Sequence, residues 1–571
     1  MHNSLKRSKL CLGAVLTAAA LVTGCGNSEN FVFTQTSPTQ PTQPILPVPA
    51  PPVAVNDFYN ALGNATVTFS AANGVLANDT VNGATITAFD ETGSQGGTVV
   101  LSADGSFAYT PEFGFVGQET FTYTLSNADG DSTATVTLTS TGQGFFVNNQ
   151  AASGGDGSQA APFDTLNPAL AAAESGDTVF VYRGNGSAYP GGFNLPVGVS
   201  LIGEGNGLVV AQQIEPEGQE PEIGGFTLLG DNTVSGFLFT GAAAGVTASG
   251  ADNLTVSNNI FRTDGAGRQT DFNNIGGTLS VVNNTFELDG NDEDSVVLVQ
   301  NDTDATVTIS DNSFGLLAAG GMDGEDAVDL NFTGNSVVTL NIERNIITGS
   351  GDTSTSMNIE SGIELDSSDT TQLTIALNDN QMSRISDHPM NINIGGQSSF
   401  SLTATDNQLT DIVRSDAVLA VFQNSCTGTQ TWSMNTVTNV QNDFSGFRLR
   451  TFDDASVTTV MTANTITSAT SNGINLVAGS TSTDTVTLRD NNFSMNTFES
   501  ILIQNSGMGS VCLDATGNTF DTDLFFNQFP PGVIGVEELA NFNAVNTFLN
   551  MSTVTTSGTI TDRPDGFCSS P

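Results

Sequence analysis

The chain has 571 residues, with 13 Lys and Arg against 59 Asp and Glu, which gives a formal net charge of −46 at pH 7. A surface this acidic repels nucleic acid and anionic membranes, so we exclude nucleic-acid binding and expect cationic partners or metal ions. The same charge would also keep an exported protein soluble in salt, which is the more conservative interpretation.

The N-terminus carries features of an export signal. Three basic residues precede an apolar run over residues 10–22, which is too short to span a membrane and suits a signal peptide. The run ends at Val22-Thr23-Gly24-Cys25, which resembles the lipobox of bacterial lipoproteins. The resemblance implies that residues 1–24 are removed and that Cys25 is lipidated; an ordinary soluble secretory signal is the alternative. Because no Asp follows Cys25, we expect an outer-membrane lipoprotein of the cell envelope, facing either the periplasm or the outside.

Residues 25–53 are predicted to form a spacer, and residues 54–140 a separate module. The spacer is rich in Pro, Thr, Ser and Gln, which indicates an extended linker behind the anchor. Short alternating segments follow, and Val75-Leu76-Ala77-Asn78-Asp79 is among the most distinctive. They resemble the cadherin-like, Ig-like sandwich repeat of bacterial surface adhesins. Some relatives bind Ca²⁺ through aspartates at module junctions, so the resemblance implies a metal site at Asp57 and Asp79; turn formation and capping are the alternative roles.

Asparagine recurs about once every 27 residues through the rest of the chain. An apolar residue follows two positions on, and most of these asparagines have apolar residues three and five positions back, which predicts a strand ending in a tight turn. A unit this short cannot bury its apolar face alone, so the units must stack as a solenoid with an internal asparagine ladder. The predicted rungs are Asn206, Asn232, Asn259, Asn284, Asn312, Asn345, Asn380, Asn407, Asn435, Asn464, Asn491 and Asn518.

The repeat resembles the right-handed parallel β-helix of pectin-lyase-like proteins. The segment from Asp156-Gly157-Ser158 onwards resembles the N-terminal cap of that superfamily. Within it, Asn167 is expected to cap a short helix opened by Pro168, with Leu170 and Ala173 closing the first coil. We therefore expect an all-β chain, in which the sandwich is followed by a β-helix of about twelve coils over residues 145–568.

The cysteine pattern predicts one disulfide. Cys512 and Cys568 are expected to tie the C-terminal tail onto the last coils in an oxidising compartment. Cys426 lies three coils before Cys512, a separation of about 14 Å that is beyond disulfide reach. Cys426 is therefore interpreted as a small buried apolar residue.

The chain carries few of the groups that catalysis on this architecture uses. The Gly-His-Gly and Arg-Ile-Lys signatures of polygalacturonase-like hydrolases and the Asp-Pro-His-Glu signature of alginate epimerases are absent. His388, the one histidine outside the predicted signal, is interpreted as a turn residue. A polysaccharide lyase or hydrolase remains an alternative, because inverting hydrolases require only two carboxylates at a suitable separation.

Acidic residues gather where the repeat lengthens. Insertions in solenoids collect on one face and often make the binding site, so we expect an acidic edge that binds Ca²⁺ or contacts a ligand. Plain solvated loops are the alternative. The predicted metal ligands are Asp292, Asp294, Asp323, Glu325 and Asp326, with Glu293 beside them, and the predicted ligand contacts are Asp352, Glu364 and Asp366.

Two arginines and the single tryptophan complete the candidates. Alternation places Arg448 and Arg450 on one strand face, where they could grip an acidic glycan. Pairing with the downstream Asp453 and Asp454 is the alternative that we favour. Trp432 occupies an inward apolar position and is predicted to lie in the core.

Together these patterns favour a non-catalytic cell-envelope lipoprotein that displays a β-helix for binding to glycan, matrix or another cell surface. Ca²⁺ is the one candidate cofactor. The membrane, through the lipid anchor, and a polysaccharide or cell-surface partner are the expected contacts. An extracellular polysaccharide lyase or hydrolase and a purely structural surface protein are the alternatives.

Overall fold

The structure, a computed structural model, describes residues 50–210, 212–241, 245–263, 268–288, 294–316, 326–350, 359–529, 532–537, 542–549, 554–557, 560–564 and 568. The predicted signal peptide and lipidated Cys25 lie outside these residues, as do Asp292, Glu293, Asp323, Glu325 and Asp352. None of the described helices is long and apolar enough to cross a membrane.

The first folded part is a β-sandwich. Strand β1 pairs in parallel with β7, and β7, β6 and β3 are antiparallel neighbours, while β2, β5 and β4 form a second, three-stranded sheet. Its buried core is aromatic, with Phe69, Phe107, Phe121 and Tyr109 in it. Its strands are β1 (Asp57–Gly63), β2 (Val67–Phe69), β3 (Thr85–Phe89), β4 (Thr98–Leu101), β5 (Phe107–Thr110), β6 (Gly117–Asn127) and β7 (Gly130–Val147).

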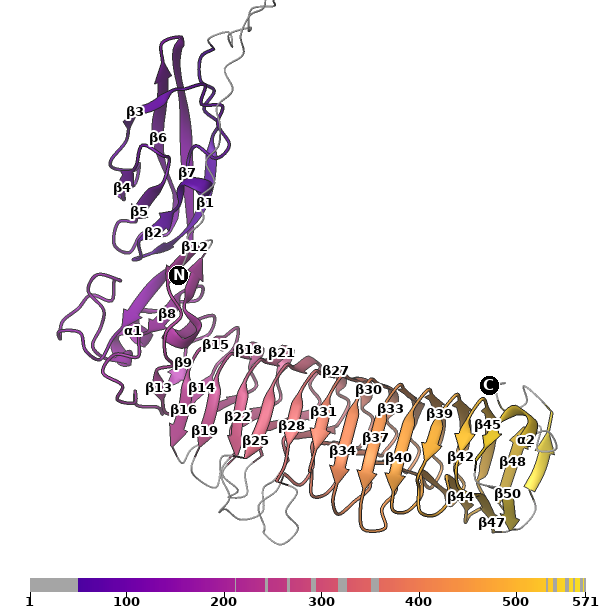
Figure 1. The fold of residues 1–571 in the computed structure, drawn as a ribbon. Helices are drawn as coiled ribbons and strands as arrows, with labels where there is room; N and C mark the ends of the chain where they lie inside the picture. The colour runs from indigo at the N-terminus through magenta and orange to yellow at the C-terminus, as the bar shows by residue number, and fades with distance from the viewer. Residues whose placement is uncertain are drawn as a thin grey trace, which may run out of the picture. The chain divides into compact units, whose positions relative to one another are not determined.

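The second part is a parallel β-helix, and the predicted all-β fold is confirmed. Three sheets, here called A, B and C in the order in which each coil visits them, are built from strands stacked in parallel coil upon coil (Figure 1). Strand β7 leads directly into it, because its residues Gly144–Val147 pair in parallel with β8. The predicted boundary between residues 140 and 145 therefore falls inside one strand.

The strands of sheet A are β8 (Thr178–Val181), β10 (Ser200–Gly203), β15 (Thr233–Ser235), β18 (Asp252–Ser257), β21 (Gly276–Val282), β24 (Ala305–Ser310), β27 (Val337–Glu343), β30 (Gln372–Asn378), β33 (Ser399–Thr405), β36 (Thr427–Ser433), β39 (Ser456–Thr462), β42 (Thr483–Arg489), β45 (Ser510–Thr516), β48 (Val533–Glu537) and β51 (Ile560–Arg563). Those of sheet B are β13 (Glu222–Ile223), β16 (Leu238–Gly241), β19 (Ile260–Thr263), β22 (Thr285–Leu288), β25 (Ser313–Leu316), β28 (Ile346–Thr348), β31 (Gln381–Ser383), β34 (Gln408–Ile412), β37 (Thr436–Val440), β40 (Thr465–Ala469), β43 (Asn492–Ser494), β46 (Thr519–Phe520) and β49 (Thr547–Phe548). Those of sheet C are β9 (Asn194–Leu195), β14 (Phe226–Leu228), β17 (Val246–Ser249), β20 (Thr270–Asn273), β23 (Val296–Asn301), β26 (Val328–Thr333), β29 (Ile363–Ser367), β32 (Met390–Ile394), β35 (Val418–Phe422), β38 (Phe447–Thr451), β41 (Ile474–Ala478), β44 (Ile501–Asn505), β47 (Leu524–Gln528) and β50 (Val554–Ser557). A hairpin of β11 (Leu208–Val210) and β12 (Gln212–Glu215), helices α1 (Leu166–Ala172) and α2 (Phe542–Val545), and two short 3₁₀ turns, Ala71–Asn73 and Glu204–Asn206, complete the described elements.

Alternation along each strand buries one face and exposes the other. In β30, Leu373, Ile375 and Leu377 are buried, and they stack in register on Phe400, Leu402 and Ala404 of β33. Repetition of this pattern gives one continuous core that runs from Phe145 to Phe542. The period-two pattern in the sequence is thus the direct cause of the coil.

Asparagines form a ladder at the corner between sheets A and B. Along most of the ladder, the backbone N–H and side-chain amide of one rung both donate to Oδ1 of the next, as from Asn380 to Asn407 over 3.0 Å each. The residue before the Asn turns the chain with a positive φ in most coils, including Met434 and Ala463. The rungs are Asn259, Asn284, Asn312, Asn345, Asn380, Asn407, Asn435, Asn464, Asn491, Asn518 and Asn546.

The predicted rungs Asn206 and Asn232 do not belong to the ladder. Register places Phe237, and not Asn232, beside Asn259, because Leu238 pairs with Ile260. Asn232 is buried at a different corner, before β15, where its Oδ1 accepts from the N–H groups of Leu229 and Gly230. Asn206 ends a short 3₁₀ turn. Asn546, which the spacing of 28 residues from Asn518 would have indicated, is the last described rung.

The N-terminal cap is helical, but its helix begins earlier than predicted. Helix α1 spans Leu166–Ala172, and its N-cap is Thr165 instead of Asn167. Leu166, Ala169 and Ala173 are buried against the first coil, and Leu170 is only partly buried. Counting the helical period of 3.6 residues from Leu166 places Leu166, Ala169 and Ala173 on one side of the helix, which is the buried side.

Cys426 and Trp432 lie in the β-helix interior, whereas Cys512 is a half-buried outward residue of β45. Cys512 and Cys568 form a disulfide with a Cα–Cα distance of 5.5 Å, which joins the C-terminal segment to β45. Cys426 is a free, buried thiol. Trp432 is 1% exposed, and its indole N–H donates to Gln430 Oε1 over 2.8 Å.

Candidate ligand-binding site

Sheet C carries a polar patch on its outward face. Strands β26, β29 and β32 stack in register, so that their outward side chains form two parallel rows of three. All six are half-buried, and outward apolar residues flank them, with Val299 on β23 and Leu419 and Val421 on β35. These six, here called the central patch, are Asp329, Asn331, Glu364, Asp366, Asn391 and Asn393.

Carboxyl groups are linked by hydrogen bonds at the corner just before sheet C. The Asp326 backbone N–H donates to Asp294 Oδ1 over 3.2 Å, and the Ser361 N–H donates to Asp326 Oδ1 over 2.8 Å. The Ser361 hydroxyl then donates to Glu364 Oε2 over 3.1 Å. These four residues, here called the acidic corner, therefore bring three coils together at the edge of the central patch.

Burial and mutual repulsion raise the pKa values of this group. Burial, followed by the charge of Glu364, raises the pKa of Asp326 to about 9. Burial and the charge of Asp294 raise the pKa of Asp329 to about 6. Burial also raises the pKa of Asp294 and of Asp366 above the usual range. At neutral pH, Asp326 therefore keeps its proton and can donate a hydrogen bond next to the carboxyl group of Glu364.

Arginines stand on both sides of the acidic residues. On one side, Arg268 Nε lies 3.6 Å from Asp294 Oδ2, and its Nη1 lies 3.5 Å from Asp271 Oδ1. Arg268 thereby lowers the pKa of Asp294, opposing the larger effect of burial. The patch is thus acidic at its centre and basic at its flanks.

On the other side, Arg448 and Arg450 face outward from β38, as alternation predicts. Arg448 Nε lies 3.0 Å from Oδ2 of the buried Asp416, which stands just before the neighbouring strand β35. The favoured pairing with Asp453 and Asp454 is therefore wrong for Arg448, because those two carboxyls occupy the turn after β38 and bond residues of adjacent coils. Arg450 makes no ion pair with any residue that the structure describes.

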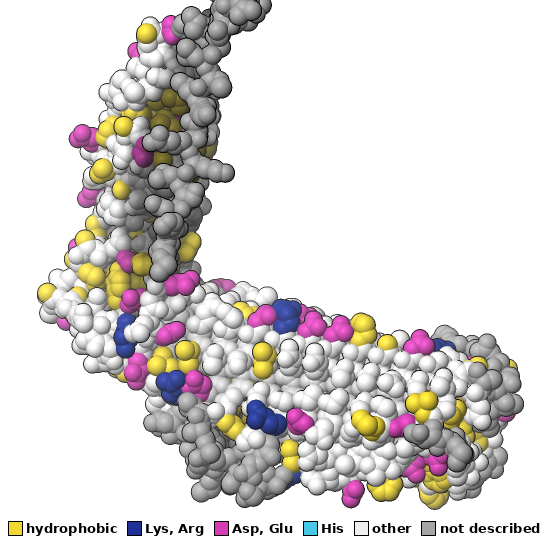
Figure 2. Space-filling model, viewed as in Figure 1, with side chains coloured by type: hydrophobic (Ala, Val, Ile, Leu, Met, Phe, Trp, Pro, Cys, Tyr) yellow, Lys and Arg dark blue, Asp and Glu magenta, His cyan; other side chains and the backbone are white. Residues whose placement is uncertain are grey.

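The face of the β-helix that shows sheet B is different in character. Figure 2 shows mainly white surface there, which is backbone and side chains that are neither charged nor hydrophobic, with scattered hydrophobic, acidic and basic side chains. Outward residues of β37 and β40 such as Thr436, Thr438, Thr465 and Thr467 account for this. A row of carboxyl and amide groups in register distinguishes sheet C from this face.

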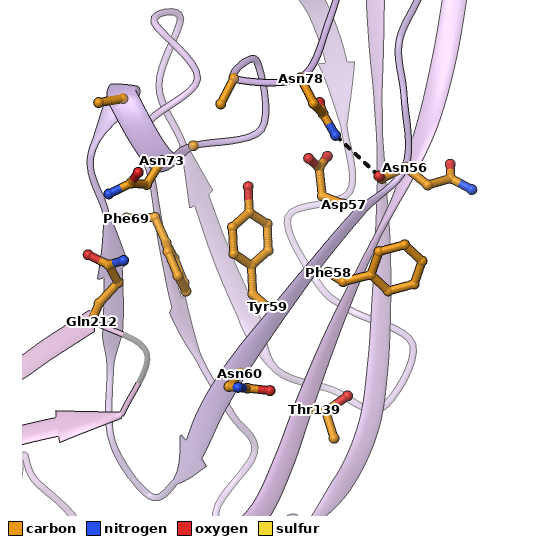
Figure 3. Close-up of a pocket in the computed structure, with 13 residues that line it drawn as sticks. Asn56, Asp57, Phe58, Tyr59, Asn60, Phe69, Asn73, Asn78, Thr139 and Gln212 are labelled. Atoms are coloured by element: carbon orange, nitrogen blue, oxygen red, sulfur yellow. Dashed lines mark hydrogen bonds between the residues drawn. The ribbon is translucent and has the colours of Figure 1, made fainter.

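Asp57 and Asp79 interact electrostatically in the sandwich, and Asp57 lines a pocket of about 550 Å³ (Figure 3). Asp79 Oδ1 accepts the Val55 N–H over 2.8 Å, and the Tyr123 hydroxyl lies 2.8 Å from Asp79 Oδ2. Asp57 is 5% exposed, and its Oδ2 has no hydrogen-bonding partner among the described residues. Burial and the charge of Asp79 raise the pKa of Asp57 to about 7. In Figure 3 the side chains of Asp57, Tyr59 and Asn78 point toward the same part of the pocket.

Within the described ranges, no three or more His, Cys, Asp or Glu side chains come together as a metal site. Asp294 and Asp326 are joined by hydrogen bonding at the acidic corner, and Asp57 and Asp79 form a pair. Asp292, Asp323, Glu325 and the predicted ligand contact Asp352 lie outside those ranges. A metal-binding acidic edge therefore stays a prediction.

Sequence reasoning found two of the six residues of the central patch. Glu364 and Asp366 are outward neighbours on β29, but Asp329, Asn331, Asn391 and Asn393 were missed. The signal was present: each lies between apolar residues in the third strand of its coil, as in Val328-Asp329-Leu330. Aligning the third strand of successive coils would have shown that polar residues recur at these outward positions.

Residues 49–139 match the family model of a bacterial Ig domain. No curated protein and no solved structure gives a significant match to the chain. The matched segment corresponds to the sandwich, and the β-helix begins after it. The chain thus carries a bacterial Ig domain followed by a parallel β-helix, a combination that fits a protein of the cell surface.

Proposed function

We propose that this protein is a lipid-anchored protein of the cell envelope whose β-helix binds an extracellular polysaccharide on the outward face of sheet C. The observation that carries the proposal is the central patch, in which three carboxyl groups and three amides face outward on adjacent strands in register. No comparable row lies on the part of sheet B described above.

The chemistry of the patch suits sugar hydroxyl groups. Carboxylates accept hydrogen bonds, and each amide both donates and accepts, so the six groups can satisfy hydroxyls as donors and as acceptors. Neighbouring strands are about 4.8 Å apart, so the groups form a regular row that an extended glycan can follow. The apolar side chains of Leu419 and Val421 at one edge can lie against the faces of sugar rings.

Arg450 extends the proposed surface toward acidic substituents. It faces outward from β38 and has no acidic partner among the described residues. A carboxylate or sulfate group on the glycan could form a charge-assisted hydrogen bond with its guanidinium. Arg448, which already pairs with Asp416, would hold the neighbouring strand in position instead.

Anchoring at Cys25 is part of the proposal and rests on the lipobox-like segment. Replacement of Cys25 by Ser would remove the acylation site. The protein is then expected to leave the membrane fraction and appear in soluble form, whereas the unchanged chain stays with membranes. Retention of the Cys25→Ser protein in the membrane fraction would contradict the anchor.

Hydrolysis of the bound polysaccharide is a second candidate, favoured by the acidic corner. Asp326, with its pKa raised to about 9, can serve as an acid. The base of an inverting hydrolase must lie about 6.5–9.5 Å from that acid to leave room for a water molecule, so it would have to be a carboxyl group further away than Glu364, which contacts Asp326 directly. Appearance of new reducing ends, lost in Asp326→Asn, would establish this candidate.

Calorimetric titration of residues 26–571 with neutral, uronate-rich and amino-sugar polysaccharides, with and without Ca²⁺, tests the binding proposal. Glu364→Gln and Asp366→Asn keep the size of the side chains and remove their charge, and both are expected to weaken binding at least about tenfold. Gln504→Ala, at an outward position further along sheet C, is the matched control and should bind as before. Equal binding by all three variants would place the binding surface elsewhere.

A further inference from the structure

A serine, a histidine and an aspartate meet at the corner that precedes sheet C. The Ser415 hydroxyl is hydrogen-bonded to His388 Nε2, and His388 Nδ1 lies 3.1 Å from Asp387 Oδ1. Nδ1 is buried and makes no hydrogen bond of standard geometry with a described residue, so the Asp387 carboxylate is a close charged neighbour that a small rotation of either side chain would bring into a hydrogen bond. Because Met390 pairs with Val418, Ser415 stands one coil above Asp387, and the imidazole of His388 reaches both.

This arrangement contains the two groups that activate a serine nucleophile, an imidazole that accepts its proton and a carboxylate that orients the imidazole. The neutral imidazole can accept the Ser415 proton at Nε2 if its own proton is held on Nδ1, and an aspartate next to Nδ1 favours that tautomer. Burial would raise the pKa of Asp387, but the contact with His388 outweighs it and lowers that pKa below the usual range. The aspartate is thus kept ionised where it can stabilise a protonated His388. Ser415 is 4% exposed, and the side chain of His388 is 12% exposed.

Two backbone N–H groups beside Ser415 are free to bind an oxyanion. Among the described residues, the N–H groups of Ser415 and Asp416 donate no hydrogen bond. At the same position in other coils, the backbone N–H donates to a carboxylate at the equivalent position of the preceding coil. For Asp416 the equivalent residue of the preceding coil is His388, whose ring is hydrogen-bonded to Ser415 instead. The occupied examples are Asp326 N–H to Asp294, Ser361 N–H to Asp326 and Ser445 N–H to Asp416.

We propose that Ser415, His388 and Asp387 are a catalytic triad for acyl transfer, and that the substrate is an acyl ester on a polysaccharide. The ester chemistry rests on the triad alone, and the polysaccharide as the carrier rests on the proposed function. The central patch begins only three residues after His388, at Asn391, so a glycan held there brings its acyl substituents to this corner. The N–H groups of Ser415 and Asp416 would stabilise the tetrahedral oxyanion.

The reaction proceeds in two balanced steps. Ser415 Oγ bonds to the ester carbonyl carbon while its proton passes to His388 Nε2, and the C–O bond to the sugar then breaks as the sugar oxygen takes that proton. A water molecule next attacks the acyl-serine and gives a proton to His388. The bond to Ser415 Oγ breaks, the proton returns to that oxygen, and the carboxylic acid leaves.

Covalent labelling of the full chain tests the proposal without any glycan. A fluorophosphonate probe, with mass spectrometry of the digested protein, is expected to modify Ser415, and p-nitrophenyl acetate is expected to be hydrolysed. Ser415→Ala and His388→Asn should each lower that hydrolysis at least about 100-fold. Ser445→Ala is the matched control, because Ser445 is a buried serine of the next coil whose hydroxyl bonds to none of the described residues.

Absence of both label and hydrolysis in the folded protein would overturn the triad, as would hydrolysis that persists in Ser415→Ala. Folding of each variant can be followed through the fluorescence of Trp432. Hydrolysis of the small ester without any polysaccharide binding would support the triad and reject the proposed function. Polysaccharide binding without label or hydrolysis would support the proposed function and reject the triad.

Discussion

Asn435 donates both its backbone N–H and its side-chain amide to Oδ1 of Asn464, over 3.0 and 2.9 Å, across one coil of the β-helix. Both asparagines are 1% exposed, so neither can exchange its partner for water. The side-chain amide of Asn464 donates to the carbonyl of Trp432 in the same coil as Asn435, 2.8 Å away. Its backbone N–H and side-chain amide also donate to Asn491 Oδ1, so one asparagine bonds to the coils on both sides.

Replacement of Asn464 by Ala should lower the free energy of unfolding by about 1–3 kcal/mol, because buried donors of Asn435 lose their acceptor. Urea unfolding followed by the fluorescence of the single Trp432 measures this. Asn475→Ala is the control. Asn475 lies on β41 and its Oδ1 has no hydrogen-bond partner in the described part of the chain, so this substitution should change the free energy of unfolding little. Equal losses in the two variants would show that the ladder adds no stability of its own.

Replacement of Ala463 by Gly should stabilise the protein by up to about 1 kcal/mol, because a left-handed backbone is strained for any residue with a Cβ. Ala463 has a φ of 57°, and the chain itself places Gly517 at the corresponding position of another coil. Thermal unfolding would show a higher Tm. Ala376→Gly, within strand β30, should instead lower the Tm. A lower Tm for both would contradict the strain argument.

Replacement of Arg448 by Met should cost about 1–3 kcal/mol or more, since it leaves the carboxyl of Asp416 buried without its cation. Arg450→Met removes the same charge from the same strand but breaks no ion pair with a described residue, so it serves as the control. The double variant Arg448→Met with Asp416→Asn should recover part of the loss. A double variant no more stable than Arg448→Met would mean that the pair is not the cause.

The pH dependence of stability should reveal the raised pKa of Asp326. Between about pH 4 and 9 the folded protein keeps a proton on Asp326 that the unfolded chain releases, so stability falls as the pH rises through this window. Asp326→Asn cannot ionise and keeps an oxygen for the Ser361 N–H, so its free energy of unfolding should fall less over the same window. Asp104→Asn removes a carboxyl whose pKa is lowered by hydrogen bonds from Ser106, and should not flatten the curve. Identical pH profiles for the original chain and Asp326→Asn would contradict a raised pKa.

Reduction of the disulfide between Cys512 and Cys568 should lower stability by about 2–5 kcal/mol, because the bridge closes a long loop at the end of the β-helix. Limited proteolysis with and without reductant should show faster cleavage near the C-terminus after reduction. Cys568→Ser should be as sensitive without reductant, whereas Cys426→Ala should keep its response to reductant. Cleavage at the same rate in all samples would argue against a stabilising bridge.

The sequence predicts the coil well because its causes are local. Alternation in segments such as residues 372–378 fixes which side chains are buried, and the Asn that follows fixes the corner. Asn232 shows the limit of this reasoning, since an asparagine at the right spacing lies at another corner when the strands of its coil are short. Only the pairing of Leu238 with Ile260 reveals the true register.

The candidate site is harder to predict because it depends on contacts between coils. Alternation placed Arg448 correctly on the strand surface, yet its partner Asp416 lies 32 residues earlier in the chain and becomes a neighbour only through stacking. Ser415 and His388 were likewise brought together by the pairing of two strands. Sequence spacing alone made His388 a turn residue, and the structure places it in the irregular segment between β31 and β32.

Polysaccharide binding by sheet C is tested most directly by a calorimetric comparison of the original chain with the double variant Glu364→Gln with Asp366→Asn. We expect saturable binding of at least one polysaccharide by the original chain and its loss in the double variant, with Trp432 fluorescence unchanged. Binding of the same affinity by both proteins would contradict a role for the outward face of sheet C.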